Sequence, residues 1–196
     1  MVATAGTSER SSAPCYFTPD AAASIRIDEV AALLGGRSDA QTVRADQELI
    51  RAGQHSPPLF IPTQGIAISY RILPNGQREI FDIILPGDFA GPPSSYFFGK
   101  ALYSVRTLTR VKLLQIPVPG LVALCNTSSK AAERILREFA SNAAVYAERL
   151  ITIGRRPATE RIAHFLLELF TRLQRIGLTD GDSFQLPLTQ EMLGDV

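Results

Sequence analysis

Apolar residues in this chain follow two different spacings, and the change from one to the other falls near Pro119. Between Val43 and Pro117 the apolar segments are short and are separated by Gly, Pro and Asn, which is typical of strands joined by turns. After Pro119 the apolar residues recur at steps of three and four, the period of an amphipathic helix. The pattern therefore predicts an α+β chain, with a β domain followed by helices.

A tight hairpin is the strongest local prediction within the β region. Residues 67–73 (AISYRIL) and 78–85 (REIFDIIL) flank the sequence PNG at residues 74–76, and an Asn-Gly pair tolerates the positive φ angles that a tight turn demands. The sequence PGD at residues 86–88 ends this ladder, and residues 104–116 resume it. Alternate residues of that last segment share one face of the expected strand, namely Val105, Thr107, Thr109, Val111 and Leu113. Several short strands at this spacing predict a sandwich or roll.

The long helix after Pro119 carries an apolar stripe suited to packing against a second helix. Its members alternate at steps of three and four, as at the a and d positions of a coiled coil, and are Leu136, Phe139, Ala143, Tyr146, Leu150 and Ile153. This stripe predicts a homodimer. A second apolar set off the stripe, Ile135, Val145 and Ile151, predicts that the helix also touches the β domain. A helix that packs its stripe only on its own β domain is the alternative.

The sequence GRRP at residues 154–157 ends this helix, because Gly lowers helix propensity and Pro begins a new helix at its first position. We interpret it as a hinge, followed by a helix over about residues 157–176. Residues 183–188 form a short strand or an extended lead-in. Thr189 then caps a last helix. We expect this helix to open a helix-turn-helix whose second, base-reading helix is absent from the sequence.

Composition narrows the chemistry. The 20 basic and 19 acidic side chains give a formal net charge of +1, so any attraction to nucleic acid must be local. Two cysteines and two histidines are too few for a four-cysteine iron-sulfur cluster or a Cys/His zinc site, and neither His55 nor His164 is well placed as a haem ligand. We therefore expect no metal and no cofactor. No apolar run approaches the ~20 residues that span a bilayer, so we expect a cytoplasmic protein with no membrane partner.

Three segments carry a resemblance to a known family. They read RILPNGQREIFDIILPGDFAG at residues 71–91, ATERIAHFLLELF at residues 158–170 and LPLTQEMLGDV at residues 186–196. With the long helix and the hinge between them, they resemble the Crp/Fnr family of bacterial transcription regulators from about residue 40 onward. The resemblance implies a homodimer that acts with RNA polymerase, in which a jelly roll of the cyclic-nucleotide-binding type senses an effector and a C-terminal winged helix reads DNA.

On this interpretation the chain has four parts. Residues 1–18 are a flexible tail, residues 19–126 an effector-sensing β-roll domain that begins with a short helix, residues 127–154 a dimerisation helix, and residues 155–196 an incomplete winged-helix DNA-binding domain. Thr189 and Gln190 are candidate contacts to DNA backbone phosphate, since a helix N-terminus favours anions. Without the base-reading helix, we expect this chain itself to lack sequence-specific DNA binding.

The sequence departs from the family pattern where members hold a cyclic nucleotide. Those members carry a Gly-Glu pair and, about ten residues later, an Arg-Ser or Arg-Thr pair whose guanidinium and hydroxyl hold the phosphate. Here Pro92 follows Gly91, and Ala101 and Leu102 stand where the arginine pair belongs. We therefore expect no cyclic-nucleotide binding, although Lys100 and Arg106 lie nearby and could compensate for the missing cation.

A different, modest organic effector is the remaining candidate, because residues 92–103 are rich in Ser and aromatic side chains. The candidate pocket residues are Gly87, Asp88, Gly91, Ser94, Ser95, Tyr96, Lys100 and Arg106. The alternative is that the aromatic rings fill a collapsed core and that no ligand exists.

Three functions are compared on these grounds. The first is a dimeric DNA-binding regulator with a degenerate or non-cyclic-nucleotide effector site, which is not an enzyme. The second is a stand-alone dimeric module that binds a ligand without binding DNA. The third is a cupin-type enzyme on the same jelly roll, which needs several histidines around a metal, whereas the β region holds one, His55.

Overall fold

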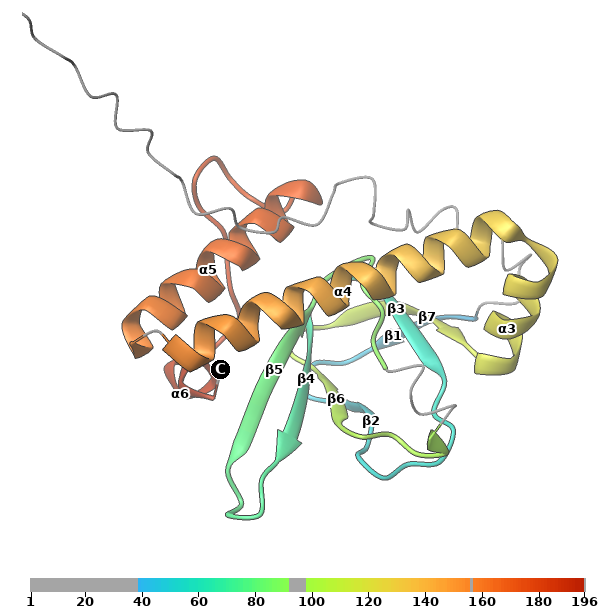
Figure 1. Cartoon of the computed structure of the whole chain (residues 1–196), viewed down its shortest axis with the longest axis horizontal. Coiled ribbons are helices and arrows are strands. Elements are labelled where there is room, and N and C mark those ends of the chain that lie inside the picture. The colour runs from blue at the N-terminus through green and yellow to red at the C-terminus, as the bar shows by residue number, and fades with distance from the viewer. Residues whose placement is uncertain (1–38, 92–97, 156, 196) are drawn as a thin grey trace, which may run out of the picture.

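The computed structural model describes residues 39–91, 98–155 and 157–195. The expected tail at residues 1–18, the expected helix within residues 19–35 and the pocket candidates Ser94, Ser95 and Tyr96 lie outside this part of the chain. Within it, strands precede helices (Figure 1). The predicted α+β class is therefore confirmed.

Two antiparallel sheets form the roll, and each holds strands that are distant in sequence. One sheet has the order β1-β7-β3 and the other the order β2-β6-β4-β5. The strands are β1 (Asp39–Val43), β2 (Glu48–Ile50), β3 (Leu59–Gln64), β4 (Ala67–Ile72), β5 (Arg78–Ile84), β6 (Ser104–Thr107) and β7 (Val111–Ile116). Because strands alternate their side chains between two faces, each sheet places one apolar set in the interior of the roll.

The predicted hairpin is present between β4 and β5. Gly76 has a φ of +83°, a backbone conformation that residues with a Cβ rarely adopt. Its N–H donates to the carbonyl of Leu73 at 2.9 Å, and Oδ1 of Asn75 accepts from the N–H of Gln77 at 3.0 Å. The turn residues therefore fix the register of this ladder, in which Ile72 faces Arg78.

The expectation of one strand over residues 104–116 is wrong. The segment is broken at residues 108–110 into β6 and β7, which belong to different sheets. Val105, Thr107, Val111 and Leu113 are nevertheless all buried, because the two sheets face each other across the interior. Alternation of apolar residues reports which side faces the core, but it does not report that the chain changes sheets between Thr107 and Val111.

Four helices follow the roll: α3 (Val118–Thr127), α4 (Ser129–Arg155), α5 (Ala158–Arg175) and α6 (Gln190–Gly194). Figure 1 shows α4 running across the roll, with α5 and α6 at its C-terminal end. The predicted break falls between α4 and α5, where Pro157 is the N-cap of α5. Residues 184–189 form neither a strand nor a helix. None of the helices in the described part of the chain is long and apolar enough to cross a bilayer.

The outer face of the four-stranded sheet carries the C-terminal helices. Phe165, Leu169 and Leu173 of α5 are buried against apolar side chains of β4 and β5, which include Ile68 and Ile80. Farther along, the carbonyl of Asp195 accepts from the N–H of Ile80 at 2.7 Å, and the carboxylate of Asp195 pairs with Arg78 at 2.6 Å. The segment after the hinge is thus docked on the roll, because burial of this apolar area is favourable.

Candidate functional site

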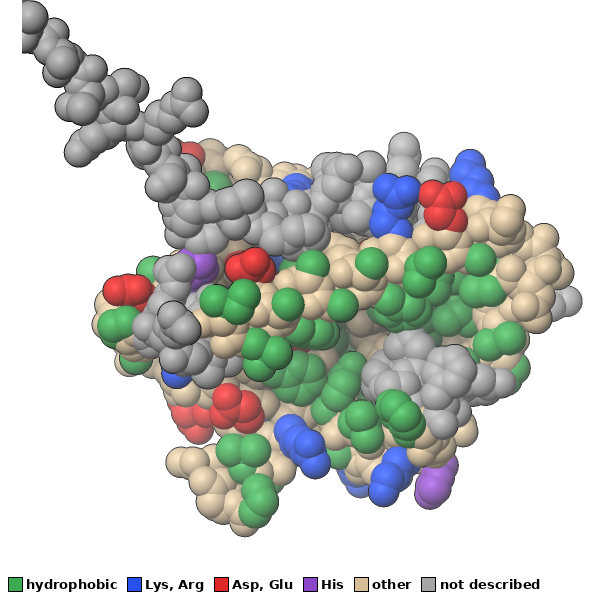
Figure 2. All heavy atoms as spheres, viewed as in Figure 1, with side chains coloured by type: hydrophobic (Ala, Val, Ile, Leu, Met, Phe, Trp, Pro, Cys, Tyr) green, Lys and Arg blue, Asp and Glu red, His purple; other side chains and the backbone are tan. Residues whose placement is uncertain are grey.

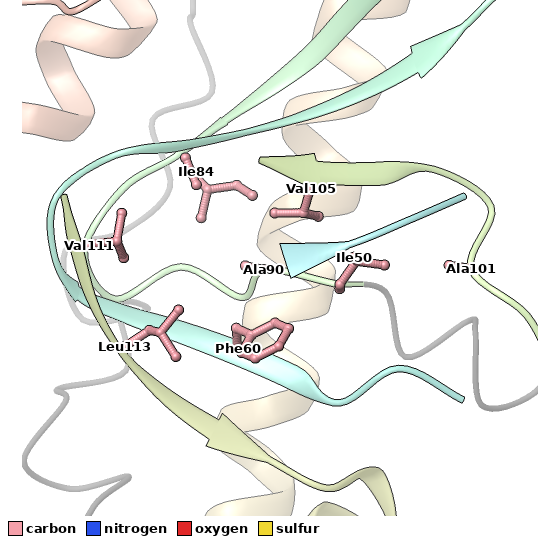
Figure 3. Packing of buried hydrophobic residues seen from close by; sticks show 9 residues of the cluster. Ile50, Phe60, Ile84, Ala90, Ala101, Val105, Val111 and Leu113 are labelled. Atoms are coloured by element: carbon pink, nitrogen blue, oxygen red, sulfur yellow. The ribbon is translucent and has the colours of Figure 1, made fainter. Parts of the chain in front are cut away.

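The interior of the roll is filled by aliphatic and aromatic side chains. Figure 3 shows residues from both sheets and their loops converging there, among them Ile50, Phe60, Ile84, Val105 and Leu113. Ala101, at the position where the family pattern places an arginine, is 2% exposed and belongs to this cluster. A phosphate at this place would lose water without gaining a cation, which is unfavourable.

Gly91 is fixed by close packing. It is buried with a φ of +103°, and a Cβ at this position would lie 2.5 Å from Cδ1 of Ile50. Its position therefore supports the interior packing of the roll. The neighbouring Ala90 bonds through its backbone to Phe60 in both directions, at 2.9 Å and 2.7 Å. The absence of a Cβ at Gly91 thus lets this turn lie close to Ile50 in the core.

The two cations that could compensate for the missing arginine lie elsewhere. Lys100 is exposed, and its backbone forms an isolated antiparallel β-bridge with that of His55. Arg106 is paired opposite Ile68, so it shares that residue's outer face of the sheet. There its Nη1 donates to Oδ1 of Asp46 at 3.0 Å, and its side chain lines an outer cleft of about 550 Å³ beside Asp195. Neither cation faces the interior cluster.

Gly87 and Asp88 form the turn that follows β5. Gly87 has a φ of +96°, and its N–H donates to the carbonyl of Pro62 at 2.9 Å. The carboxylate of Asp88 accepts from the N–H of Leu85 at 2.7 Å and from Nη2 of Arg172 in α5, also at 2.7 Å. In this arrangement Asp88 connects the roll to the helices.

Five charged side chains form an ion cluster where the helices meet the roll. They are Asp82, Asp88, Arg149, Glu168 and Arg172. Arg149 of α4 holds Glu168 of α5 through two bonds, of 3.0 Å from Nε and 2.7 Å from Nη2. Nη1 of both arginines lies 3.5 Å from Oδ1 of Asp82. The cluster thereby joins β5, the turn after it, α4 and α5.

Backbone carbonyls of β5 also hold the two arginines. Nη2 of Arg172 donates to the carbonyl of Ile83 at 2.8 Å, and Nη1 of Arg149 donates to the carbonyl of Phe81. Burial alone would lower the pKa of each guanidinium, but the neighbouring carboxylates outweigh it and raise both pKa values. Both arginines therefore stay charged, and both bind β5 and α5 simultaneously.

The predicted interface stripe on α4 divides between two directions. Phe139 packs its ring 5.7 Å from that of Phe89, and the hydroxyl of Tyr146 donates to Oδ2 of Asp82 at 3.3 Å, so these two residues lie against the chain's own roll. Leu136 and Leu150 are 69% and 71% exposed, and Ala143 is also exposed. The side chain of Ile153 lies outside the described residues. The role of the stripe as an interface stays a prediction.

The second apolar set of α4 also divides. Ile135 is buried against the three-stranded sheet, as the sequence predicts, whereas Ile151 is exposed. Ala140 and Ala147, which lie outside the predicted stripe, are exposed as well. Among the described side chains of α4, the exposed apolar residues other than Tyr146 therefore follow steps of mostly four and three, and are Leu136, Ala140, Ala143, Ala147, Leu150 and Ile151. Figure 2 shows apolar side chains gathered along this helix.

The last helix begins as the sequence predicts. The side chain of Thr189 accepts from the N–H of Met192 at 3.2 Å, which is an N-cap bond. Gln190 is exposed at the first position of α6. The contact of these two residues with DNA stays a prediction. In the described part of the chain, no group of three or more His, Cys, Asp or Glu side chains is arranged to hold a metal ion.

Comparison with known sequences agrees with this geometry. Residues 40–128 match the family model of the cyclic nucleotide-binding domain. The transcriptional activatory protein AadR of Rhodopseudomonas palustris is 30% identical over 136 residues, which are 67% of this chain and 54% of that protein. The nitrogen fixation regulation protein FixK of Bradyrhizobium diazoefficiens is 26% identical over 132 residues, with the same coverage. The chain spans about half the length of these curated relatives.

Solved structures share the fold. FixK2 from Bradyrhizobium japonicum superposes with a TM-score of 0.68 at 22% identity, covering 81% of this chain and 76% of that one. The catabolite activator protein of Thermus thermophilus gives a TM-score of 0.56 at 20% identity, covering 79% and 70%.

Residues 40–128 thus form a roll of the cyclic-nucleotide-binding type, and a long helix runs across it. Residues 40–128 belong to the cyclic nucleotide-binding domain family, and the chain is similar to regulators of the Crp/Fnr family. The relatives named above are regulators by name, in agreement with the expectation that this chain is not an enzyme.

Proposed function

We propose that this chain is the sensing and coupling part of a dimeric, DNA-binding transcription regulator whose roll does not hold a cyclic nucleotide. The observation that carries the proposal is the threefold use of α4. One side of this helix packs on the roll through Phe139, its C-terminal half holds α5 through Arg149, and its remaining side leaves Leu136 and Leu150 exposed. A helix with these contacts can relay a change in the roll to α5 of the same chain. Its exposed side can pack against a second copy across a two-fold axis.

The occupant proposed for the exposed side of α4 is the same side of a second copy. Exposed apolar residues at steps of mostly four and three match the spacing at which two helices pack along a seam. The alanines at 140, 143 and 147 allow close approach of the helix backbones, and the leucines at 136 and 150 supply apolar area at either end. A stable isologous contact buries this face in both copies simultaneously.

The dimer is tested by sedimentation of the full chain at micromolar concentration. We expect a dimer for the wild type and a monomer for Leu150→Glu, because the substitution places two like charges near the two-fold axis. Leu178→Glu is the matched control, since Leu178 is 50% exposed but lies after α5. A monomeric wild type, or a Leu150→Glu dimer of wild-type affinity, contradicts the proposal.

DNA binding is proposed for the complete gene product, with RNA polymerase as the partner that the family implies. It is tested by sequencing the genomic fragments that this product retains. Enrichment of a two-fold-symmetric site supports a regulator, because protein symmetry is mirrored in the half-sites. A dimer without any enriched site instead supports the stand-alone ligand-binding module.

The effector proposed for the roll is a small organic molecule other than a cyclic nucleotide. The apolar cluster around Ala101 supports this, because it supplies no cation for a phosphate. Phe81 and Tyr103, which stack edge to face with centroids 4.7 Å apart, are half-buried and offer aromatic contact area near Asp82.

A further inference from the structure

A further charged residue, Glu138, interacts with the five-residue ion cluster, and the functions proposed above assign it no role. Glu138 of α4 is 6% exposed, and its neighbour Phe139 packs on Phe89 beside the turn that holds Asp88. Glu138 receives a long hydrogen bond, 3.5 Å from Nδ2 of Asn142 to Oε1. A carboxylate in this setting is poorly compensated for the water it has lost.

The charged side chains that act on Glu138 belong to the roll and to α5. Asp88 and Asp82 of the roll raise its pKa, and Arg172 of α5 lowers it, while Asn142 of α4 donates the hydrogen bond. The described residues of the cluster and Glu138 together hold four carboxylates and two guanidiniums. Negative charge is therefore in excess.

The two guanidiniums are already committed to other carboxylates. Arg172 lies 2.7 Å from Asp88, and Arg149 lies 2.7 Å from Glu168. Burial raises the pKa of Glu138, the charge of Asp88 raises it further, and Arg172 offsets part of this effect, so that the pKa reaches about 7. Glu138 is thus the member of the group that takes up a proton near neutral pH.

We propose that Glu138 and the ion cluster form a proton-sensitive latch, in which uptake of one proton at Glu138 strengthens the docking of α4 and α5 on the roll and loss of that proton weakens it. The direction follows from linkage, because a proton bound more tightly in the docked state stabilises that state. The latch changes how firmly the C-terminal helices are held, and it operates without an effector.

The test is hydrogen exchange of the full chain between pH 5.5 and 8.5, corrected for the intrinsic pH dependence of exchange. The readout is the opening equilibrium of peptides from α4 and α5 divided by that of β3 and β7, which serve as an internal reference. We expect this ratio to rise on the order of tenfold across the range, because the linked pKa difference spans more than one pH unit. A ratio that does not change with pH overturns the proposal.

Two variants separate the latch from a general effect of pH. Glu138→Gln should keep the ratio at its low-pH level throughout, because the amide mimics the protonated carboxyl group. Glu133→Gln is the matched control, since Glu133 lies on the same helix but is exposed and paired with Arg137. A pH slope that persists in Glu138→Gln overturns the proposal.

The wild type alone provides a second measurement, should Glu138→Gln not fold. With glutamate carboxyl carbons labelled, one NMR resonance should titrate with a midpoint near pH 7. The absence of any glutamate carboxyl group titrating above pH 6 overturns the proposal. None of these measurements uses DNA, and the α5 peptides and the carboxyl titration report on the latch away from the proposed α4 interface, so the latch and the proposed function can fail separately.

Discussion

Arg172 of α5 holds Asp88 of the roll, with Nη2 and Oδ2 2.7 Å apart. The two residues are separated by 84 positions in the chain, and their contact is shorter than the one that Arg172 makes with Asp82 in β5. The same guanidinium lies 3.4 Å from Glu168 and 3.5 Å from Asp82. The docking of the C-terminal helices thus depends strongly on one side chain.

Arg172→Met should lower the free energy of unfolding by about 3 kcal/mol, because it leaves the partly buried Asp88 without its cation and removes one of the two cations of Asp82 and Glu168. Urea unfolding at pH 7 measures the loss. Arg137→Met is the control, since its ion pair with Glu133 is exposed and should contribute less than about 1 kcal/mol. Equal losses in the two variants would contradict the role assigned to Arg172.

Stability should depend on pH through Glu138. A carboxyl group whose pKa is raised from 4.5 to about 7 by folding contributes stability that is fully present below pH 4.5 and is lost as the pH rises to 7. The difference in unfolding free energy between the wild type and Glu138→Gln should therefore change by on the order of 2 kcal/mol between pH 5 and pH 8. A difference that is constant across this range would refute the assignment.

Gly91→Ala should destabilise the roll by about 1–3 kcal/mol, because the new Cβ meets Cδ1 of Ile50 and the φ of +103° is strained for alanine. Gly53→Ala provides the comparison. Gly53 also has a positive φ, of +85°, but a Cβ added there would meet no atom within 4 Å, so only the backbone cost applies. Thermal unfolding of the two variants should rank Gly91→Ala as the less stable.

Cyclic AMP at 1 mM should leave the melting temperature of the chain unchanged. A ligand that binds the folded state with a Kd of 10 μM stabilises it by about 2.7 kcal/mol at this concentration, which calorimetry detects readily. The interior around Ala101 offers no cation for the phosphate, so no such stabilisation is expected. A rise of several degrees would show that the nucleotide binds by another arrangement of groups.

The local features of the fold were predictable from the sequence, because their causes are local. The Asn-Gly turn, the cap at Thr189 and the break before Pro157 each depend on a few adjacent residues.

The features that were missed depend on contacts between distant segments. Periodicity placed Phe139 and Tyr146 on one stripe with Leu150, but it cannot assign one side of a helix to the roll and another to solvent. Asp82 lies 67 residues from its partner Arg149, and Asp88 lies 84 residues from its partner Arg172, so no spacing rule connects these pairs. Charged residues on the core-facing sides of α4 and α5 were the signal that the sequence offered, because a charge that faces a core needs a partner.

The bond from the N–H of Ile80 to the carbonyl of Asp195 has a consequence for solubility. β5 is the outermost strand of its sheet, and outermost strands offer unpaired N–H and C=O groups to other molecules. The docked C-terminal segment covers part of that margin, and Arg78 is occupied there as well. Detaching this segment would open β5 to strand addition, so variants that loosen it should aggregate before they unfold.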